Sequence, residues 1–191
     1  MPFTIQPLTA DTWSAFDTLV HAHNGVFGGC WCLSFHAVSK KGRTYEERRS
    51  EKRALVSAGR AHAALVYDGE SCVGWCQFGS PAELPEIKNK KNYASTLTGE
   101  PPPWRITCFF VDRHHRKAGV AAAALKGALR EIGKLGGGIV EAYPEDTHGT
   151  MISPTFLHAG TLAMFEQAGF AIDRQIGKNK YVVKKRVRKP A

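Results

Sequence analysis

The sequence predicts a mixed α/β domain in which helices flank a single sheet, and three observations lead to this fold class. The first half carries two strand-like segments around an Asp68-Gly69 turn, which is typical of a hairpin. The middle carries a β-branched and aromatic segment, an alanine-rich helical segment and another strand-like segment, which predicts a βαβ unit. The last part carries a helix followed by two more strands.

Seven segments have the alternation and the β-branched content of strands. They cover residues 3–7, 61–67, 72–78, 106–111, 139–143, 170–175 and 181–187. Two longer polar segments, residues 80–103 and 144–155, separate some of them. The first of these is long for a loop, so we expect it to contain either a lid or a short helix.

Four helices are expected from apolar spacing and capping residues. The first is capped by Thr9 or Asp11 and is interrupted at residues 24–29. In the second, Thr44 and Glu47 have the spacing of a capping box, and the helix ends near residue 58. The third helix is the alanine-rich segment, one side of which is expected to be buried, and the fourth spans residues 156–168. The buried side of the third helix is predicted to carry Val120, Ala124, Leu125, Ala128, Leu129 and Ile132.

Composition is consistent with one domain over residues 1–191, because this length can bury a sizeable core and no linker divides it. No signal peptide or membrane span is visible, so we expect a cytoplasmic protein with five reduced cysteines. The formal net charge is +9, but residues 178–191 hold seven Lys and Arg and no acid, which leaves +2 for the rest. We therefore expect a basic, solvated tail at about residues 184–191 rather than a nucleic-acid-binding surface.

The joint between the strand at 106–111 and the following helix has the features of an anion site. A helix that follows a short loop presents free N–H groups and the positive end of its dipole. Gly119 and the small Ala118 and Ala121 let a ligand approach the backbone, and Arg116 and Lys117 add positive charge. A ligand that carries phosphate is the expected occupant.

This joint also resembles a known family. Arg116-x-x-Gly119-x-Ala121, five residues after a strand ending in Val111, is similar to the R/Q-x-x-G-x-G/A segment that cradles the acetyl-CoA pyrophosphate in GCN5-related N-acetyltransferases (GNAT). The segment TLAMFEQAGF at 161–170 resembles the late helix of that family and the Gly-Phe pair that opens its next strand. The resemblance covers about residues 13–183.

The resemblance implies a GNAT-like, mostly antiparallel sheet with a central acetyl-CoA-binding unit. It also implies acetyl-CoA as the cofactor, with the strand backbone paired to the pantetheine arm and one N–H facing the thioester oxygen. The residues that would bind the cofactor are Phe109, Phe110, Val111, Arg116, Lys117, Ala118, Gly119, Val120, Ala121 and Ala122. In this family an amine attacks the thioester directly in a ternary complex, so the amine must first lose a proton.

The positions that supply a base and an acid in relatives hold Arg105 and Phe165 here. We therefore take Tyr143 and Glu141, at the exit of the neighbouring strand, as candidate catalytic residues. The alternative is that Glu141 is a surface strand residue and Tyr143 a half-buried core aromatic. If Arg105 faces the acceptor site, it suits a substrate that carries a carboxylate.

The segment Cys30-x-Cys32-x-x-x-His36 admits two interpretations. It is a partial zinc motif that needs a ligand from elsewhere, such as Cys108, and its C-x-C spacing is not the usual one. The preferred interpretation is that Cys30, Trp31 and Phe35 line the acceptor pocket or belong to the core, and His36 could then contact the acceptor. The substrate-binding candidates are Cys30, Trp31, Phe35, His36 and Arg105, and no metal is predicted.

Together these patterns predict an acetyl-CoA-dependent N-acetyltransferase that acts on an amine of a small molecule or peptide. The alternative is a non-catalytic acyl-CoA-binding module or an RNA-associated protein that uses the basic tail. We expect no membrane contact, and the sequence leaves monomer and homodimer open.

Overall fold

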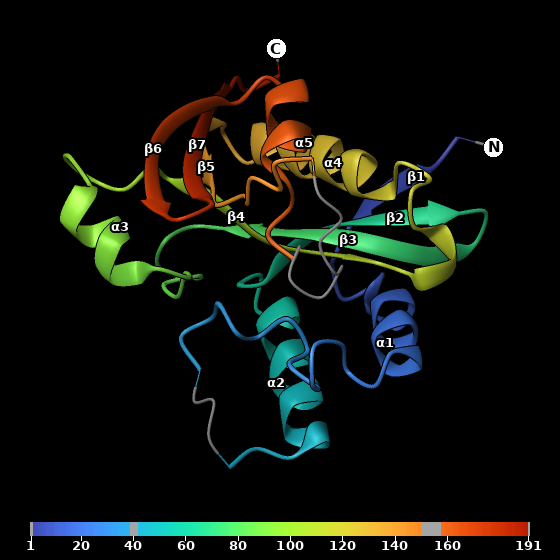
Figure 1. Ribbon diagram of the computed structural model, residues 1–191. Coiled ribbons are helices and arrows are strands. Elements are labelled where there is room, and N and C mark those ends of the chain that lie inside the picture. Colours follow the sequence, from blue (N-terminus) through green and yellow to red (C-terminus); the bar gives the residue numbers. More distant parts are fainter. Residues whose placement is uncertain (1, 39–41, 150–157, 191) are drawn as a thin grey trace.

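The computed structural model describes residues 2–38, 42–149 and 158–190. In these residues one sheet of seven strands crosses the molecule in the order β1-β2-β3-β4-β5-β7-β6 (Figure 1). The strands are β1 (Thr4–Pro7), β2 (His62–Asp68), β3 (Ser71–Gly79), β4 (Trp104–Val111), β5 (Gly138–Ala142), β6 (Ala171–Gly177) and β7 (Lys180–Val187). Only β4 and β5 pair in parallel, and the other neighbours are antiparallel. The predicted mixed, mostly antiparallel sheet is confirmed.

Helices cover both faces of this sheet. They are α1 (Trp13–Ala22), α2 (Tyr45–Ser57), α3 (Lys90–Thr96), α4 (Val120–Lys134) and α5 (Leu162–Gln167), with a short 3-10 turn, η1 (Arg113–His115). Figure 1 shows α4 and α5 on one face and α1 and α2 on the opposite face. Among the described residues, no helix has the length and apolar content needed to cross a membrane.

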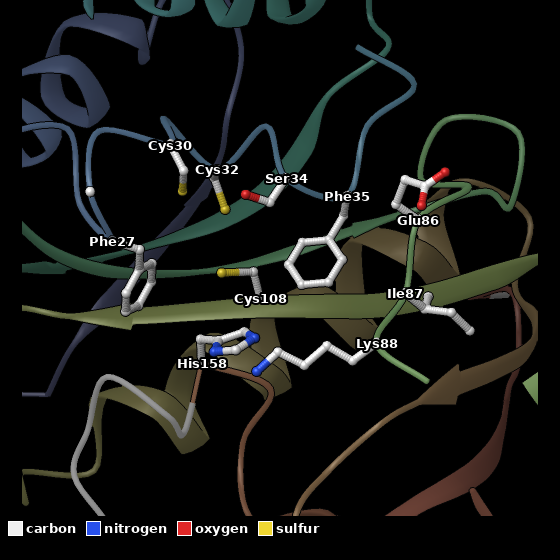
Figure 2. Close-up of a pocket in the computed structure, with 11 residues that line it drawn as sticks. Phe27, Cys30, Cys32, Ser34, Phe35, Glu86, Ile87, Lys88, Cys108 and His158 are labelled. Carbon is white, nitrogen blue, oxygen red and sulfur yellow. The ribbon is translucent and has the colours of Figure 1, made fainter. Parts of the chain in front are cut away.

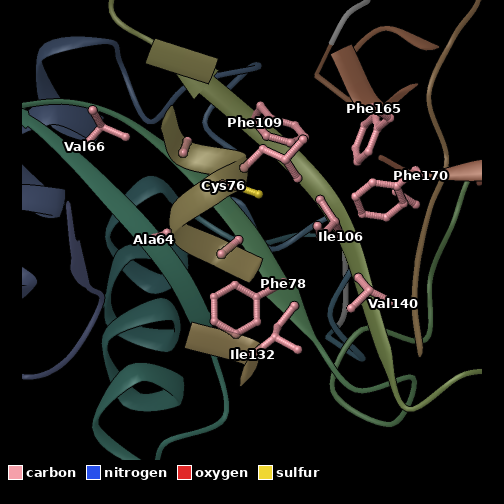
Figure 3. Close-up of a cluster of buried hydrophobic side chains, with 14 of the residues drawn as sticks. Ala64, Val66, Cys76, Phe78, Ile106, Phe109, Ile132, Val140, Phe165 and Phe170 are labelled. Carbon is pink, nitrogen blue, oxygen red and sulfur yellow. The ribbon is translucent and has the colours of Figure 1, made fainter. Parts of the chain in front are cut away.

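The larger core lies between α4 and the sheet (Figure 3). Alanine and leucine at helical spacing let α4 lie flat on strands β1 to β4. Gly127 allows the closest approach, because a Cβ atom there would lie 2.5 Å from Ile5 Cγ2. Of the six side chains predicted to face the core, five are buried, and Leu129 is partly exposed.

A second core joins the opposite face of the sheet to α1 and α2, and aromatic rings dominate it. Phe16 of α1 lies 4.9 Å from Trp75 of β3, and Trp13 stacks on Trp31, with 6.3 Å between ring centroids. Trp31 and Trp75 are both fully buried. This core fixes the loop after α1 against the middle of the sheet.

Two of the predicted helix starts need correction, and one is confirmed. The Thr44–Glu47 capping box is present at the start of α2. The expected caps of α1 are wrong: its N-cap is Thr12, whose hydroxyl donates to the Pro7 carbonyl instead of capping the helix. Helix α5 begins at Leu162 after the Thr161 cap, so residues 158–161 are not helical as predicted, and residues 156–157 lie outside the described part.

Residues 184–187, which the sequence analysis assigned both to the last strand and to the basic tail, belong to β7. They pair with β5 on one side, and Lys184 also pairs with Ala171 of β6 on the other. Lys184 further forms an ion pair with Asp173 at 2.9 Å. Strand alternation places the basic side chains beside the buried Val182 and Val183, so a run of charge did not mark the end of the fold. The polar segment at 80–103 contains the short helix α3, one of its two predicted forms.

Candidate active site

The turn between β4 and α4 forms a cradle of backbone N–H groups. Asp112 caps η1 by accepting from the His114 N–H at 2.7 Å, and Lys117 and Gly119 then adopt left-handed conformations with φ of +64° and +85°. Gly119 is the N-cap of α4 and gives it no side-chain cap, so the first N–H groups of the helix have no intrahelical partner. Arg116 is exposed beside them. This arrangement suits an anion.

Next to the cradle, the edge of β4 is free of β5. The parallel pairing begins where Trp104 lies opposite Val140 and ends where Ile106 lies opposite Ala142, although β4 continues to Val111. Beyond that point the Phe109 N–H donates to the His158 carbonyl at 2.6 Å. Because N–H groups alternate in direction along a strand, the Val111 N–H points to the same side, away from β3. Beside the cradle, β4 therefore has backbone donors that β5 does not bind. One of them, the Phe109 N–H, is already bonded to His158.

A cavity of about 500 Å³ lies on the α1 and α2 side of this edge (Figure 2). Four parts of the chain contribute to its wall: the loop after α1, strand β4, the segment before α3, and His158, whose carbonyl accepts from Phe109. It is lined by Phe27, Gly28, Cys30, Cys32, Ser34, Phe35, Glu86, Ile87, Lys88, Cys108 and His158. The wall is largely apolar and thiol, with Glu86 at one end, and the Lys88 side chain extends along it toward His158 (Figure 2).

The loop that supplies most of this wall has an unusual backbone. Left-handed φ values occur at Asn24, Gly25, Val26, Phe27, Gly28, Gly29, Trp31 and Cys32. Such a conformation is strained for a β-branched residue such as Val26, whose φ is +49°. The loop is held by its own backbone, as in the Cys30 N–H that donates to Val26 O at 3.0 Å. This backbone path places the side chains of Phe27, Cys30 and Cys32 in the cavity wall.

Below the cavity lies a fully buried lysine, Lys52 of α2. Its Nζ donates to Gln77 Oε1 at 2.9 Å, lies 3.3 Å from His36 Nε2 and 3.5 Å from the Cys32 carbonyl oxygen. Gln77 in turn donates to Thr107 at 3.1 Å. Burial and the charge of Lys52 lower the pKa of His36 to about 3, so this imidazole is neutral and accepts from Lys52.

Three thiols converge on one side of the cavity, from Cys30, Cys32 and Cys108 (Figure 2). The Cys108 thiol donates to the Phe109 carbonyl at 3.8 Å. Its interaction with Cys32, together with Lys52, lowers the pKa of Cys32 to about 7, and the same interaction and burial raise the pKa of Cys108 well above its ordinary value. Burial raises the pKa of Cys30. Within the described residues, no group of three or more ligands is placed to hold a metal ion.

A different buried network surrounds Glu141, whose side chain is fully buried. Arg105 donates to Glu141 Oε1 at 3.0 Å and to the Leu84 carbonyl at 3.0 Å. The hydroxyl of Tyr93 donates to the same Glu141 oxygen at 2.8 Å, and so does that of Tyr143. Burial and the nearby carboxylate raise the pKa of Tyr143 well above its usual value, so it is a neutral phenol near pH 7.

The structure corrects three of the sequence-based placements. Arg105 is not among the residues that line the cavity and forms an ion pair with Glu141 at 3.0 Å. Trp31 is packed in the second core, against Trp13 and Tyr45 rather than in the cavity wall. His36 is 2% exposed and bonds Lys52.

The other predicted residues fall into two groups. Cys30 and Phe35 line the cavity as expected. Glu141 is not a surface residue, and neither it nor Tyr143 is among the cavity-lining residues. Their catalytic roles therefore stay predictions.

Lys52 and Phe27 were missed by the sequence analysis. A charged residue in a polar helix is usually solvent-exposed, which hides Lys52. One signal was present: Lys52 lies four positions before the buried Val56 and therefore shares its face of α2. Phe27 lies in a glycine-rich loop whose path no local pattern predicts.

No family model and no curated protein matches the sequence. Solved structures match over nearly the whole chain. One is a protein from Corynebacterium glutamicum described as histone acetyltransferase HPA2 and related acetyltransferase. Its TM-score is 0.58 and its identity 15%, with 100% of this chain and 99% of that one covered. The protein yncA from Salmonella typhimurium, solved with its cofactor acetyl-CoA, has a TM-score of 0.55 and 12% identity, with 99% and 96% covered. A GNAT-family acetyltransferase from Streptococcus pneumoniae has a TM-score of 0.51 and 13% identity, with 97% and 99% covered. The chain therefore has the fold of the GNAT acetyltransferases.

Proposed function

We propose that this protein is an acetyl-CoA-dependent N-acetyltransferase that acts on an amine of a small molecule or peptide. The observation that carries this proposal is that three features meet along β4. The N–H cradle lies at its end, the part of the strand that does not pair with β5 begins beyond Ile106, and the cavity reaches the strand at Cys108. Acetyl-CoA binding by the structural neighbour yncA supports the choice of acyl donor.

The cradle fits the diphosphate of coenzyme A. A Cβ atom at Gly119 would meet no atom within 4 Å, so the space in front of the helix N-terminus is open. Free N–H groups and the cationic Arg116 and Lys117 supply the donors and charge that a diphosphate needs. In this proposal the cofactor contacts are Phe109, Phe110, Val111, Arg116, Lys117, Ala118, Gly119, Val120, Ala121 and Ala122.

The chemistry asks the protein to do two things. An acceptor amine with a pKa of about 10 has to lose a proton before it attacks the thioester. The oxyanion that develops in the attack needs a backbone donor. Val111 N–H points to the open edge and suits this role, whereas the Phe109 N–H is already bonded to His158. The cavity beside the edge is the proposed acceptor site.

The test begins with acetyl-CoA binding, measured by calorimetry and by the rise in melting temperature that a native-state ligand causes. Gly119→Glu places a side chain and a negative charge in the cradle, so we expect binding to be lost. Gly69→Glu is the matched control, because Gly69 also has a left-handed φ of +58° and no atom within 4 Å of its Cβ position.

Equal binding by wild type and both variants would remove the cradle from the proposal. With binding established, coenzyme A release in the presence of a panel of primary amines identifies the acceptor. We expect release to depend on the amine, and release with no amine preference would contradict acetyl transfer to an amine.

A further inference from the structure

Lys52 is a buried lysine without a carboxylate partner in the described residues, and burial lowers its pKa. Each of its contacts is neutral: an amide oxygen of Gln77, a neutral imidazole of His36 and the carbonyl of Cys32. A buried charge without a counter-ion is costly. The groups that act on Lys52 against the effect of burial are the thiols of Cys32, Cys108 and Cys30. A thiolate is therefore the anion available to balance it.

The surroundings of the Cys32 sulfur favour a thiolate. The Cys108 thiol and Lys52, whose Nζ lies 3.5 Å from the Cys32 carbonyl oxygen, both lower the pKa of Cys32. The indole N–H of Trp75 is fully buried and makes no hydrogen bond to any described group. It lies close enough to the Cys32 sulfur to favour the charged form. A neutral thiol would leave these donors without a strong acceptor.

Glu86 lines the same cavity but lies at the opposite end from Cys32 (Figure 2). The titratable groups closer to Cys32 do not supply an alternative anion. His36 is neutral, and the Glu83 carboxylate beyond it is bound by His62 at 3.2 Å and by the Ser80 N–H at 2.8 Å. Burial raises the pKa of Cys76, behind Cys32 in the sheet. Cys30 faces the same cavity, and its pKa is also raised.

We propose that Cys32 is a thiolate with Lys52 as its counter-ion and that it accepts the proton of the acceptor ammonium in the cavity. The proposal rests on the N-acetyltransferase function above and names its base. Cys32 lines the cavity beside Cys108, one residue before the Phe109 that begins the open edge of β4. The base is therefore placed between the acceptor site and the acyl-donor site.

The protons of the reaction balance without any further reactant. The acceptor R-NH₃⁺ gives one proton to the Cys32 thiolate and becomes a neutral amine. The nitrogen lone pair forms the C–N bond and the C–S bond of the thioester breaks. The second nitrogen proton passes to the leaving coenzyme A thiolate, and the Cys32 thiol returns its proton to solvent.

The first test follows the thiolate itself, by its ultraviolet absorbance during a pH titration of the full chain without ligand. The difference between wild type and Cys32→Ser should show one thiolate with a midpoint near pH 7. Lys52→Met should move that midpoint upward by one pH unit or more, as an ion pair predicts. Cys72→Ser, which changes a thiol outside the cavity, should leave the midpoint unchanged. A difference that appears only above pH 8.5 would overturn the proposal.

The second test uses acetyl transfer to the best amine of the panel. Cys32→Ser should lower kcat/KM by roughly a hundred- to ten-thousandfold, the range for losing a general base, and should remove the acidic limb near pH 7. Cys72→Ser should behave as wild type, and acetyl-CoA binding should persist in both. An unchanged pH profile in Cys32→Ser would overturn the assignment.

Incubation with acetyl-CoA alone separates a base from a nucleophile. We expect no acetyl group on the Cys32 peptide by mass spectrometry, because the thiolate acts on the amine. Stable acetylation of Cys32 that an amine then removes would overturn the role as a base. If acetyl-CoA does not bind at all, the proposed function fails, and the titration still decides whether Cys32 and Lys52 form an ion pair.

Discussion

Two buried polar clusters lie close to β4, and they differ in how their charges are matched. In the first, Arg105 and Glu141 form a permanent ion pair, completed by two tyrosine hydroxyls on the same carboxylate oxygen. In the second, Lys52 contacts neutral acceptors and lies near thiols. The first cluster is not among the groups that line the cavity, whereas the second reaches it through Cys32.

The difference teaches which cluster can move a proton at neutral pH. Glu141 is held by the ion pair with Arg105 and by two tyrosine hydroxyls on the same carboxylate oxygen, so its contacts are already taken up. A thiol with an ordinary pKa of 9.0 carries its proton at pH 7 at no cost. Cys32 can therefore be charged or neutral with little change in free energy, and a group of that kind suits proton transfer.

The largest expected effect comes from making the same change in both clusters. Arg105→Met leaves the Glu141 charge buried without its partner, and we expect a loss of about 3 to 5 kcal/mol in the free energy of unfolding. Lys52→Met should cost less, about 1 to 2 kcal/mol, because Cys32 can take up a proton and the groups that lose a donor, on Gln77, His36 and Cys32, are neutral. Urea unfolding at pH 7 measures both.

A double variant sharpens this test. Arg105→Met with Glu141→Leu removes both charges, so it should recover most of the loss caused by Arg105→Met alone. Equal losses for Arg105→Met and Lys52→Met would contradict the distinction between the clusters.

The second effect is a pH dependence of stability that belongs to the Lys52 cluster. The pKa of Cys32 is about 7 in the folded chain, against 9.0 for an unperturbed thiol. Between these values the unfolded state binds the extra proton, so stability rises with pH, is complete near pH 9 and is lost as pH falls through 7. A two-unit shift corresponds to about 2 to 3 kcal/mol.

Urea unfolding between pH 6.5 and 9 measures this rise, and Cys32→Ser should remove it. Above pH 9 the trend reverses, because the raised pKa of Cys108 makes the unfolded state the better acid there. The Arg105 cluster should add no slope in this window, since it holds no thiol. A rise that persists in Cys32→Ser would assign it to another group.

How far the sequence could predict these features depends on how many positions separate the residues that form each feature. The strands, the Thr44–Glu47 cap and the N–H cradle at Gly119 depend on neighbouring residues, and all are present. The bend of the chain after α1 depends on several left-handed residues in succession, which local patterns do not specify. The acceptor wall was therefore predicted only in part.

The charge partners could not be predicted, because they join separate elements. Arg105 and Glu141 lie 36 positions apart and meet only because β4 and β5 pair in parallel at that register. Lys52 and Cys32 lie 20 positions apart and meet across the second core. The position at the exit of a strand favoured Glu141 and Tyr143 as the reactive groups, and Cys32 was considered only as part of the partial zinc motif.

The smallest expected effect concerns Tyr143, whose predicted catalytic role the geometry does not favour. Its hydroxyl donates to Glu141 rather than to the cavity, and its raised pKa keeps it protonated, so it cannot accept a proton from an amine at neutral pH. Tyr143→Phe should cost about 1 kcal/mol of stability, because Arg105 and Tyr93 still donate to the same oxygen. We expect kcat/KM to stay close to that of wild type. Tyr93→Phe is the matched control, since it removes the other hydroxyl from that oxygen and should give a similar result. A ten- to thousandfold fall in kcat/KM for Tyr143→Phe alone would instead make Tyr143 a catalytic acid and move the proton transfer from the thiol cluster to this one.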